Sequence, residues 1–130
     1  MDIISALFVE NINLRQVPGP STRIDLSGIM FSLPAPGEPP VTLAPHLVVI
    51  VRCRADEPGE GILEVVFKDE KGEEVARNAS PFTVEPGKFT YRLVRGELTF
   101  ASYGTIEAHC RIGRGDWTVV PLTLFPSPEG

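Results

Sequence analysis

The chain has 130 residues, of which 42% are hydrophobic and 22% charged, and its formal net charge is -5. This length and composition predict one soluble globular domain whose core needs no metal or disulfide to hold it together. The acidic balance, with no run of Lys or Arg, argues against binding to nucleic acid or to an anionic membrane surface.

The amino-terminal stretch MDIISALFVENINLR lacks the features of a targeting or membrane-spanning segment. Asp2 stands where a signal peptide carries Lys or Arg, and Glu10 and Asn11 end the apolar run early. No stretch of the sequence approaches the roughly 18 apolar residues that a transmembrane helix needs. We therefore expect a cytoplasmic protein without a membrane span.

Pro and Gly residues, 13 and 12 in number, punctuate a series of short apolar runs. This pattern is typical of an all-β domain. The expected strands, in chain order, are Ile3–Asn11, Ile24–Leu33, His46–Ala55, Ile62–Asp69, Glu74–Arg77, Lys88–Val94, Thr105–Ile112 and Thr118–Phe125. About eight antiparallel strands in one domain, residues 1–130, predict an immunoglobulin-like or C2-like β-sandwich, with a barrel as the alternative.

Four local signals refine this expectation. The apolar phase of IDLSGIMFSL slips at Gly28, which predicts a β-bulge. The segment 34–40, PAPGEPP, is too rich in Pro for a strand and is expected to form a polyproline-like surface loop. Pro121 cannot donate to a ladder, so the last strand is expected at an edge or at a bulge. The tail, residues 126–130, is expected to fray.

Alternation along the strands assigns side chains to the two faces of each sheet. The outer, polar set is Arg52, Arg54, Glu64, Arg92, Glu107, His109 and Arg111. The inner set is Leu47, Val49, Val51, Cys53, Leu63, Val65, Phe67, Phe89, Tyr91, Leu93, Ile106, Ala108, Cys110, Ile112, Val120, Leu122 and Leu124.

The two cysteines are expected to be reduced, buried and unreactive. In immunoglobulin domains a Trp lies between the paired cysteines, whereas Trp117 follows Cys110 here. A zinc site would need both cysteines together with His46 and His109, but His109 and Cys110 are strand neighbours that point to opposite faces. We expect no metal site.

Neither the two acidic loops nor any sequence motif predicts a calcium site or a catalytic site. The loops 55–61 and 68–74 flank a single strand, so they lie at opposite ends of a sheet and cannot share one calcium ion. The sequence has no nucleophile elbow and no phosphate-binding Gly loop. We expect neither an enzyme nor a cofactor.

The tripeptide Arg114-Gly115-Asp116 is an adhesion ligand in some extracellular proteins, but parity explains it here as part of a turn. For Cys110 and Val120 both to point inward, the loop between their strands needs an odd number of residues. A three-residue loop, 113–115, fits, with Gly115 in the left-handed position of a hairpin with a G1 bulge. We therefore expect a hairpin tip and no adhesion function.

The same register opposes Cys110 with Thr118 and places Arg111 beside Trp117 on the solvent face. There the guanidinium is expected to lie over the indole ring. Trp117, Tyr103 and Arg111 form a candidate stacking surface for a carbohydrate or another small ligand.

The run LVVIVRC, residues 47–53, is apolar on both faces, which indicates that both faces are covered. If the loop 56–60 closes a hairpin, Arg52 opposes Glu64 and Ile50 opposes Val66. The expected outer patch consists of Val48, Ile50, Ile62 and Val66 beside the Arg52–Glu64 pair. This candidate interface would be covered by the same chain, by a second subunit of a homo-oligomer or by another protein.

Two longer stretches carry a family resemblance. Residues 45–76, PHLVVIVRCRADEPGEGILEVVFKDEKGEEVA, read as two strands around an acidic Gly turn and then a D-x-x-G hairpin. Residues 104–124, GTIEAHCRIGRGDWTVVPLTL, read as a closing hairpin. Preceded by ALFVENI and DLSGIMFSL, they resemble a family of small uncharacterised bacterial β-sandwich proteins of unknown function.

The resemblance implies an immunoglobulin-like or C2-like sandwich and brings no catalytic residues. The function that we expect is a non-catalytic protein-interaction or scaffold module. Binding of a small ligand or carbohydrate is the alternative, and catalysis is the third possibility.

Overall fold

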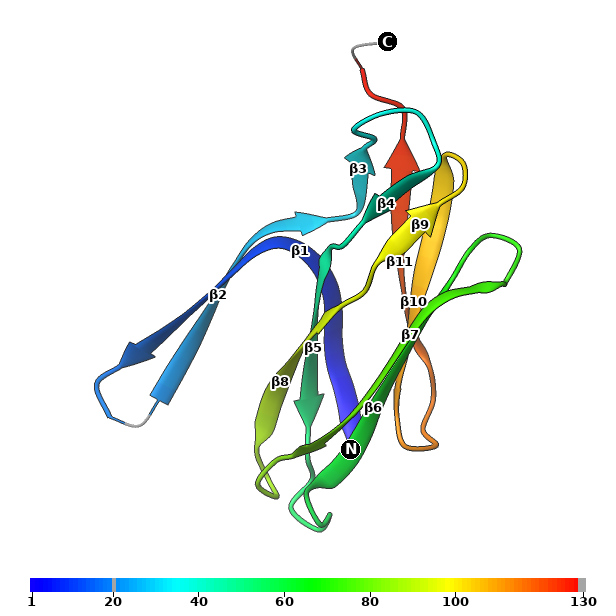
Figure 1. Ribbon diagram of the computed structural model, residues 1–130. Helices are drawn as coiled ribbons and strands as arrows, with labels where there is room; N and C mark the ends of the chain where they lie inside the picture. The colour runs from blue at the N-terminus through cyan, green and yellow to red at the C-terminus, as the bar shows by residue number, and fades with distance from the viewer. Residues whose placement is uncertain (20, 129–130) are drawn as a thin grey trace.

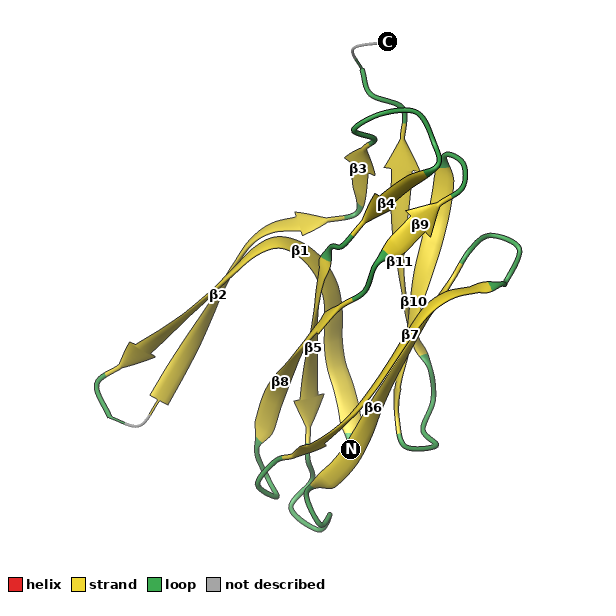
Figure 2. Ribbon diagram, viewed as in Figure 1, coloured by secondary structure: helices red, strands yellow, loops and turns green. Residues whose placement is uncertain are grey.

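The computed structural model describes residues 1–19 and 21–128, which form eleven β-strands and no helix (Figure 2). The strands are β1 (Asp2–Val17), β2 (Ser21–Met30), β3 (Ser32–Pro34), β4 (Val41–Leu43), β5 (His46–Arg52), β6 (Glu60–Lys68), β7 (Glu74–Thr83), β8 (Phe89–Arg95), β9 (Leu98–Phe100), β10 (Gly104–Ile112) and β11 (Thr118–Phe125). The all-β prediction is confirmed. Within the described ranges, no helix is long and apolar enough to cross a membrane.

The described strands build two larger sheets and one small ladder (Figure 1). Sheet A has the order β2-β1-β5-β8, sheet B has the order β3-β11-β10-β6-β7, and β4 pairs with β9. The pairings are antiparallel except for β3 with β11, which is parallel. Side chains from both sheets and from β9 form one hydrophobic core, so each sheet buries one face against the other.

The inner-face prediction is confirmed for β5, β6, β10 and β11. The residues of that set that are buried are Leu47, Val49, Val51, Cys53, Leu63, Val65, Phe67, Ile106, Ala108, Cys110, Leu122 and Leu124. Ile112 and Val120 are partly buried and pack against the same core.

The inner-face prediction is wrong for β8. Its register pairs Val94 with Leu47 and Arg92 with Val49, so these two side chains point inward. Phe89 and Leu93 are exposed instead, at 70% and 45%. An inward Arg is tolerated because β8 is the last strand of sheet A, where a long side chain reaches solvent past the edge.

The hairpin between β10 and β11 has the predicted register but a different turn residue. Cys110 pairs with Thr118, and Ala108 pairs with Val120. Gly113, with a φ of 57°, takes the left-handed conformation that was expected at Gly115. The Gly113 N–H also donates to the Ile62 carbonyl at 3.0 Å, which ties the turn to β6.

The expected bulge at Gly28 is not present. Val9 pairs with Ile29 and Asn11 with Ser27, so one register continues on both sides of the glycine. Gly28 has a φ of 69°. Met30, which is in phase with Leu26, packs against the core, whereas Ile29 and Phe31 are exposed, so the apolar phase does not slip either.

The remaining local expectations have mixed outcomes. Pro121 pairs with Glu107 of β10, and β3 joins β11 only from Thr123, so the other side of Pro121 faces an unpaired edge as expected. The expectation of a surface loop over 34–40 is wrong at its start, because Pro34 is the last residue of β3 and Ala35 is buried in the core. Residues 126–128 follow the last strand, and the rest of the tail lies outside the described residues.

Candidate interaction surface

The most prominent feature outside the sandwich is a two-stranded arm, which we define as residues 11–19 and 21–27. β1 pairs with β5 only from Asp2 to Val9. Beyond Val9, the residues of β1 pair with β2 alone, and β2 is the last strand of sheet A. In Figure 1 the arm extends away from the body of the sandwich, toward the lower left.

One face of the arm is apolar. Ile12 pairs with Leu26, and Leu14 pairs with Ile24. Directly opposed residues share a face of the ribbon, so these four side chains form one aliphatic surface. Leu14 is 46% exposed, and the other three are partly buried.

The opposite face of the arm is polar. It carries Asn11, Asn13, Arg15, Arg23, Asp25 and Ser27. Arg15 donates to both carboxylate oxygens of Asp25, from Nε at 2.6 Å and from Nη2 at 3.2 Å. These hydrogen bonds lower the pKa of Asp25 and raise that of Arg15.

The second arginine of this face lacks such a partner. Arg23 lies directly opposite Arg15 across the ribbon, where like charges repel. Its guanidinium donates to the Ser21 hydroxyl at 3.1 Å. Among the described residues no carboxylate pairs with Arg23.

A groove of about 650 Å³ separates the arm from the outer face of sheet A. Its lining residues are Ser21, Thr22, Arg23, Ile24, Leu26, Ile50, Phe89, Thr90 and Tyr91. The β2 residues in this set come from both faces of the arm, which indicates that the free edge of β2 is turned into the groove. The opposite wall is formed by β5 and β8 and is largely apolar.

The structure does not bring the predicted interface residues together. β5 and β6 belong to different sheets, so the hairpin expected from loop 56–60 is wrong. The connection crosses from sheet A to sheet B, where Gly59 accepts a hydrogen bond from Val84 N–H at 2.8 Å. Arg52 therefore cannot oppose Glu64.

The members of that predicted patch are distributed over two sheets. Val48 is only 1% exposed, so the outer face of β5 is covered at that position within one chain. Ile50 lines the groove beside the arm. Val66 is buried and Ile62 is exposed, both on β6.

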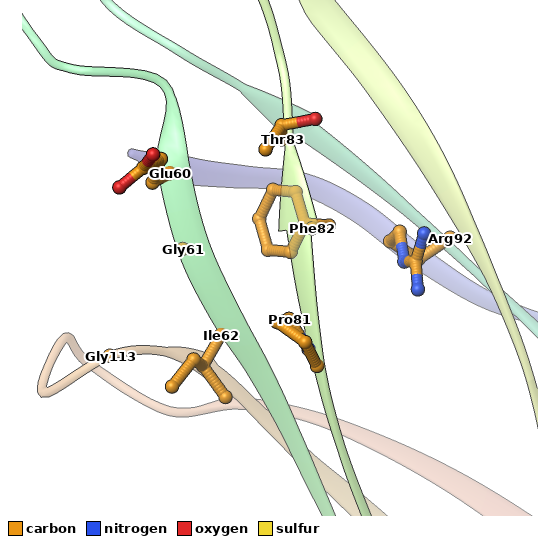
Figure 3. Close-up of a pocket in the computed structure, with 8 residues that line it drawn as sticks. All are labelled: Glu60, Gly61, Ile62, Pro81, Phe82, Thr83, Arg92 and Gly113. Atoms are coloured by element: carbon orange, nitrogen blue, oxygen red, sulfur yellow. The ribbon is translucent and has the colours of Figure 1, made fainter.

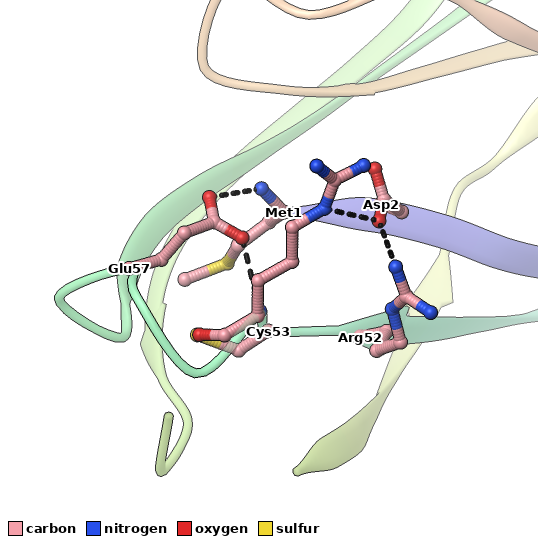
Figure 4. A network of polar contacts seen from close by, with 6 residues as sticks. Met1, Asp2, Arg52, Cys53 and Glu57 are labelled. Carbon is pink, nitrogen blue, oxygen red and sulfur yellow. Dashed lines mark hydrogen bonds and ion pairs between the residues drawn. The ribbon is translucent and has the colours of Figure 1, made fainter. Parts of the chain in front are cut away.

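Arg52 pairs instead with the amino-terminal segment (Figure 4). Its Nη2 donates to Asp2 Oδ2 at 3.0 Å, and Arg54 Nε lies 3.3 Å from the same oxygen. These two guanidinium groups, Arg54 first, lower the pKa of Asp2. Glu57 pairs with the Met1 amino group and accepts the Arg54 N–H, so the network fastens β1 to the end of β5.

The predicted stacking surface is formed in part. The Arg111 guanidinium lies over the Trp117 ring, 4.2 Å from its centre, as predicted. The His109 ring meets Trp117 edge-on, with 6.2 Å between the ring centres. Tyr103 precedes β10, whereas Trp117 follows its far end, so Tyr103 lies away from this cluster.

Glu64 pairs with two arginines on the outer face of sheet B. Its carboxylate accepts from Arg111 Nε at 2.8 Å and also pairs with Arg77. The hydrogen bond from Arg111 is the main cause of the lowered pKa of Glu64. The arrangement is a surface ion-pair network, because every member is satisfied within the chain.

A larger, open pocket of about 920 Å³ is lined by residues of β6 and β7, by Arg92 of β8 and by Gly113 of the β10–β11 turn (Figure 3). The inward-pointing Arg92 lies there with its guanidinium carbon 5.8 Å from the centre of the Phe82 ring. Glu60 is the other charged residue in the lining. One arginine and one distant carboxylate do not form an acid–base or nucleophile pair.

Neither the cysteines nor the acidic loops form a reactive site in the described part of the chain. Cys53 and Cys110 are free and buried. Burial raises the pKa of Cys110 to about 12. Over residues 1–19 and 21–128, no group of three or more His, Cys, Asp or Glu side chains is arranged to hold a metal ion.

Sequence reasoning missed the arm although its signal was present. Ile12 and Leu14 alternate with polar residues, as do Ile24 and Leu26, on either side of the sequence Pro18-Gly19-Pro20. The expected first strand ends at Asn11, whereas β1 continues to Val17.

No protein family matches the sequence, and no curated protein matches it.

Proposed function

We propose that this chain is a non-catalytic protein-interaction or scaffold module built on an immunoglobulin-like or C2-like β-sandwich. The observation that carries the proposal is the amphipathic arm beside an apolar groove. An isolated two-stranded hairpin is marginally stable in water, because one ribbon buries too little apolar surface. The arm therefore gains stability from any protein that covers its apolar face.

Exposed apolar side chains near the groove support the same function. Phe89 is 70% exposed on its wall, and Leu93 is 45% exposed on the same face of β8. Burial of such surface contributes about 25 cal/mol per Å² of apolar area removed from water. Exposed apolar surface that is grouped in this way is typical of an interaction site.

The alternative, a site for a small ligand or carbohydrate, has weaker support. Trp117 already stacks with Arg111, and Tyr103 lies beyond the opposite end of β10. A stacking site needs aromatic rings that converge on one ligand. The buried thiols fit the cytoplasmic location that we propose for the protein.

Affinity capture from a native lysate, with untagged copies of the chain scored among the captured proteins, tests the interaction function. The test variant is Leu14→Lys, which places a charge on the apolar face of the arm. The matched control is Ile62→Lys, which changes an exposed residue of sheet B to the same side chain. Proteins retained by the wild type and the control but lost from Leu14→Lys support the function. An identical set for all three baits contradicts it.

A further inference from the structure

We propose that the groove receives the arm of a second copy of this chain, so that two β2 strands pair antiparallel about a two-fold axis at Ile24. The proposal rests on the interaction function above and names its partner. Strand addition to an exposed sheet edge is a general mode of recognition, in which main-chain hydrogen bonds provide affinity.

The edge of β2 is open to such pairing. β2 is the last strand of sheet A, so one row of its backbone N–H and C=O groups has no strand beside it. Natural edge strands are commonly blocked by Pro, by charged side chains, above all Lys, or by a bulge. β2, STRIDLSGIM, contains no Pro and no Lys, its register with β1 is regular, and its two charged residues, Arg23 and Asp25, have opposite signs.

The charges of β2 are self-complementary about Ile24. Antiparallel pairing with Ile24 on the axis opposes Arg23 of each copy with the second copy's Asp25. The same register opposes Thr22 with the second copy's Leu26. Opposite charges at directly paired positions stabilise a sheet, and here the axis generates two such pairs.

This register also supplies an acidic partner for Arg23, which has none among residues 1–19 and 21–128. There Arg23 lies opposite Arg15 and donates to a neutral hydroxyl, Ser21 Oγ. In the dimer each Asp25 lies between Arg15 of its own chain and Arg23 of the other. Across the paired strands, Arg23 then lies between the like charge of Arg15 on its own chain and the opposite charge of the second copy's Asp25.

The same two-fold axis also brings apolar side chains of the two copies together. A two-fold axis perpendicular to the ribbon keeps the apolar faces of both arms on one side. The two Ile24 side chains then meet on the axis, and each is flanked by a Leu26. An incoming arm would also lie against the groove wall that Ile50, Phe89 and Tyr91 provide.

The self-complementarity points to a second copy rather than to an unrelated protein. Closed two-fold dimers use one surface patch twice, so the patch must complement itself. The sequence Arg-Ile-Asp at residues 23–25 meets this requirement in charge, because its two ends carry opposite signs. An unrelated strand would need its own matching sequence.

Sedimentation velocity over a range of concentrations tests the proposal with a charge swap. We expect the wild type to associate into a dimer. Arg23→Asp places a carboxylate opposite the second copy's Asp25 at both pairs and should raise the dimer dissociation constant by at least about tenfold. The double variant Arg23→Asp with Asp25→Arg restores opposite charges in the same register and should restore the dimer.

Two features of this experiment distinguish loss of the dimer from unfolding of the arm. Within one chain, Arg23→Asp replaces the Arg15–Arg23 repulsion with an opposite-charge pair, so the arm itself is not weakened. Asn11→Lys serves as the control, because it adds a charge to the polar face on β1, away from the free edge. This control should dimerise like the wild type.

A wild type that stays monomeric at every concentration overturns the second-copy proposal. A dimer that Arg23→Asp leaves intact, or that the double variant does not restore, also overturns it. The interaction function is judged separately by the lysate experiment, since an arm that binds a different protein would pass that test and fail this one.

Discussion

Arg111 holds Trp117 and Glu64 at the same time: its guanidinium carbon lies 4.2 Å from the centre of the indole ring, and its Nε donates to Glu64 Oε1 at 2.8 Å. One side chain thus couples the β10–β11 hairpin to β6. Because the guanidinium is planar, it can stack on a ring and donate a hydrogen bond in its own plane.

Replacement of Arg111 by Ala should lower the free energy of unfolding, with about 0.5–1 kcal/mol from the lost contact with Trp117. Urea unfolding of Arg111→Ala, Trp117→Ala and the double variant measures the coupling between the two side chains. A coupling energy of zero would show that the stacked geometry contributes nothing.

Glu64 should make stability depend on pH in acid. Its pKa in the folded state lies below the ordinary value for a glutamate, mainly because Arg111 donates to it. Its contribution is therefore fully present above the unfolded pKa and is lost as the pH falls through the folded pKa. Glu64→Gln should lower the melting temperature at neutral pH and leave a smaller difference from the wild type near about pH 3.

Melting temperatures of the wild type and Glu64→Gln between about pH 7 and about pH 3 check this sign. Asp2, Asp25 and Glu57 also have lowered pKa values, so both proteins should lose stability in acid. The informative quantity is the difference between the two curves. A difference that is constant or that widens in acid contradicts the assignment.

Two glycines with similar backbone angles should respond differently to Ala. Gly59 has a φ of 84°, and a Cβ there would lie 2.2 Å from the Val84 carbonyl oxygen. Gly72 has a φ of 81°, with nothing within 4 Å of its Cβ position. Gly72→Ala should cost about 1–2 kcal/mol for the left-handed conformation alone. Gly59→Ala should cost more, because the backbone of the crossing loop must also move.

Denaturant unfolding of the two Ala variants gives the comparison, since the shared backbone cost cancels in their difference. Equal destabilisation of both variants would mean that the close approach of Gly59 to Val84 is not rigid.

Cys110 should resist thiol reagents in the folded protein. The thiolate is the reactive form, and a pKa raised to about 12 leaves almost none of it at neutral pH. Labelling followed by peptide mass spectrometry should find Cys110 unmodified natively and modified after unfolding in urea. Rapid modification of Cys110 under native conditions would show that the thiol is neither buried nor protonated as described.

Short-range parity was enough to predict the hairpin between β10 and β11. Alternation from Ala108 to Cys110 and from Thr118 to Leu122 left only an odd loop, and the Arg111–Trp117 contact followed from the register. A one-residue error would have reversed every side chain of one strand. Sequence patterns are therefore sufficient where both strands bury one face and the connection is short.

Sequence alternation was not enough where pairing between sequence-distant strands sets the sheet or the inward face of a strand. Loop 56–60 resembles a hairpin turn, yet it crosses between sheets, because β5 pairs with β1 and β8. In β8, alternation alone allowed either face, and Val94 rather than Tyr91 faces the core. Sequence-distant partners, which are Leu47 and Val49 in this case, set that choice.

The arm has the alternation of a strand in its sequence, but little of the burial that normally accompanies this pattern. Most of its residues are exposed on both faces, so strand formation there depends on the pairing of Leu14 with Ile24 and on the Arg15–Asp25 ion pair. Our own prediction placed the candidate interface on β5 and β6. Of its members, only Ile50 lies in the groove beside the arm.

Amide hydrogen exchange along β2 tests the central claim, that the arm's free edge pairs with another strand, most directly. In a single chain, alternate N–H groups from Thr22 to Leu26 point toward β1 and the others point away from it. We expect the outward groups to become protected together as the concentration of the purified protein rises into the dimer range. Protection that alternates along Thr22 to Leu26 at every concentration would contradict the pairing of β2 with a second copy.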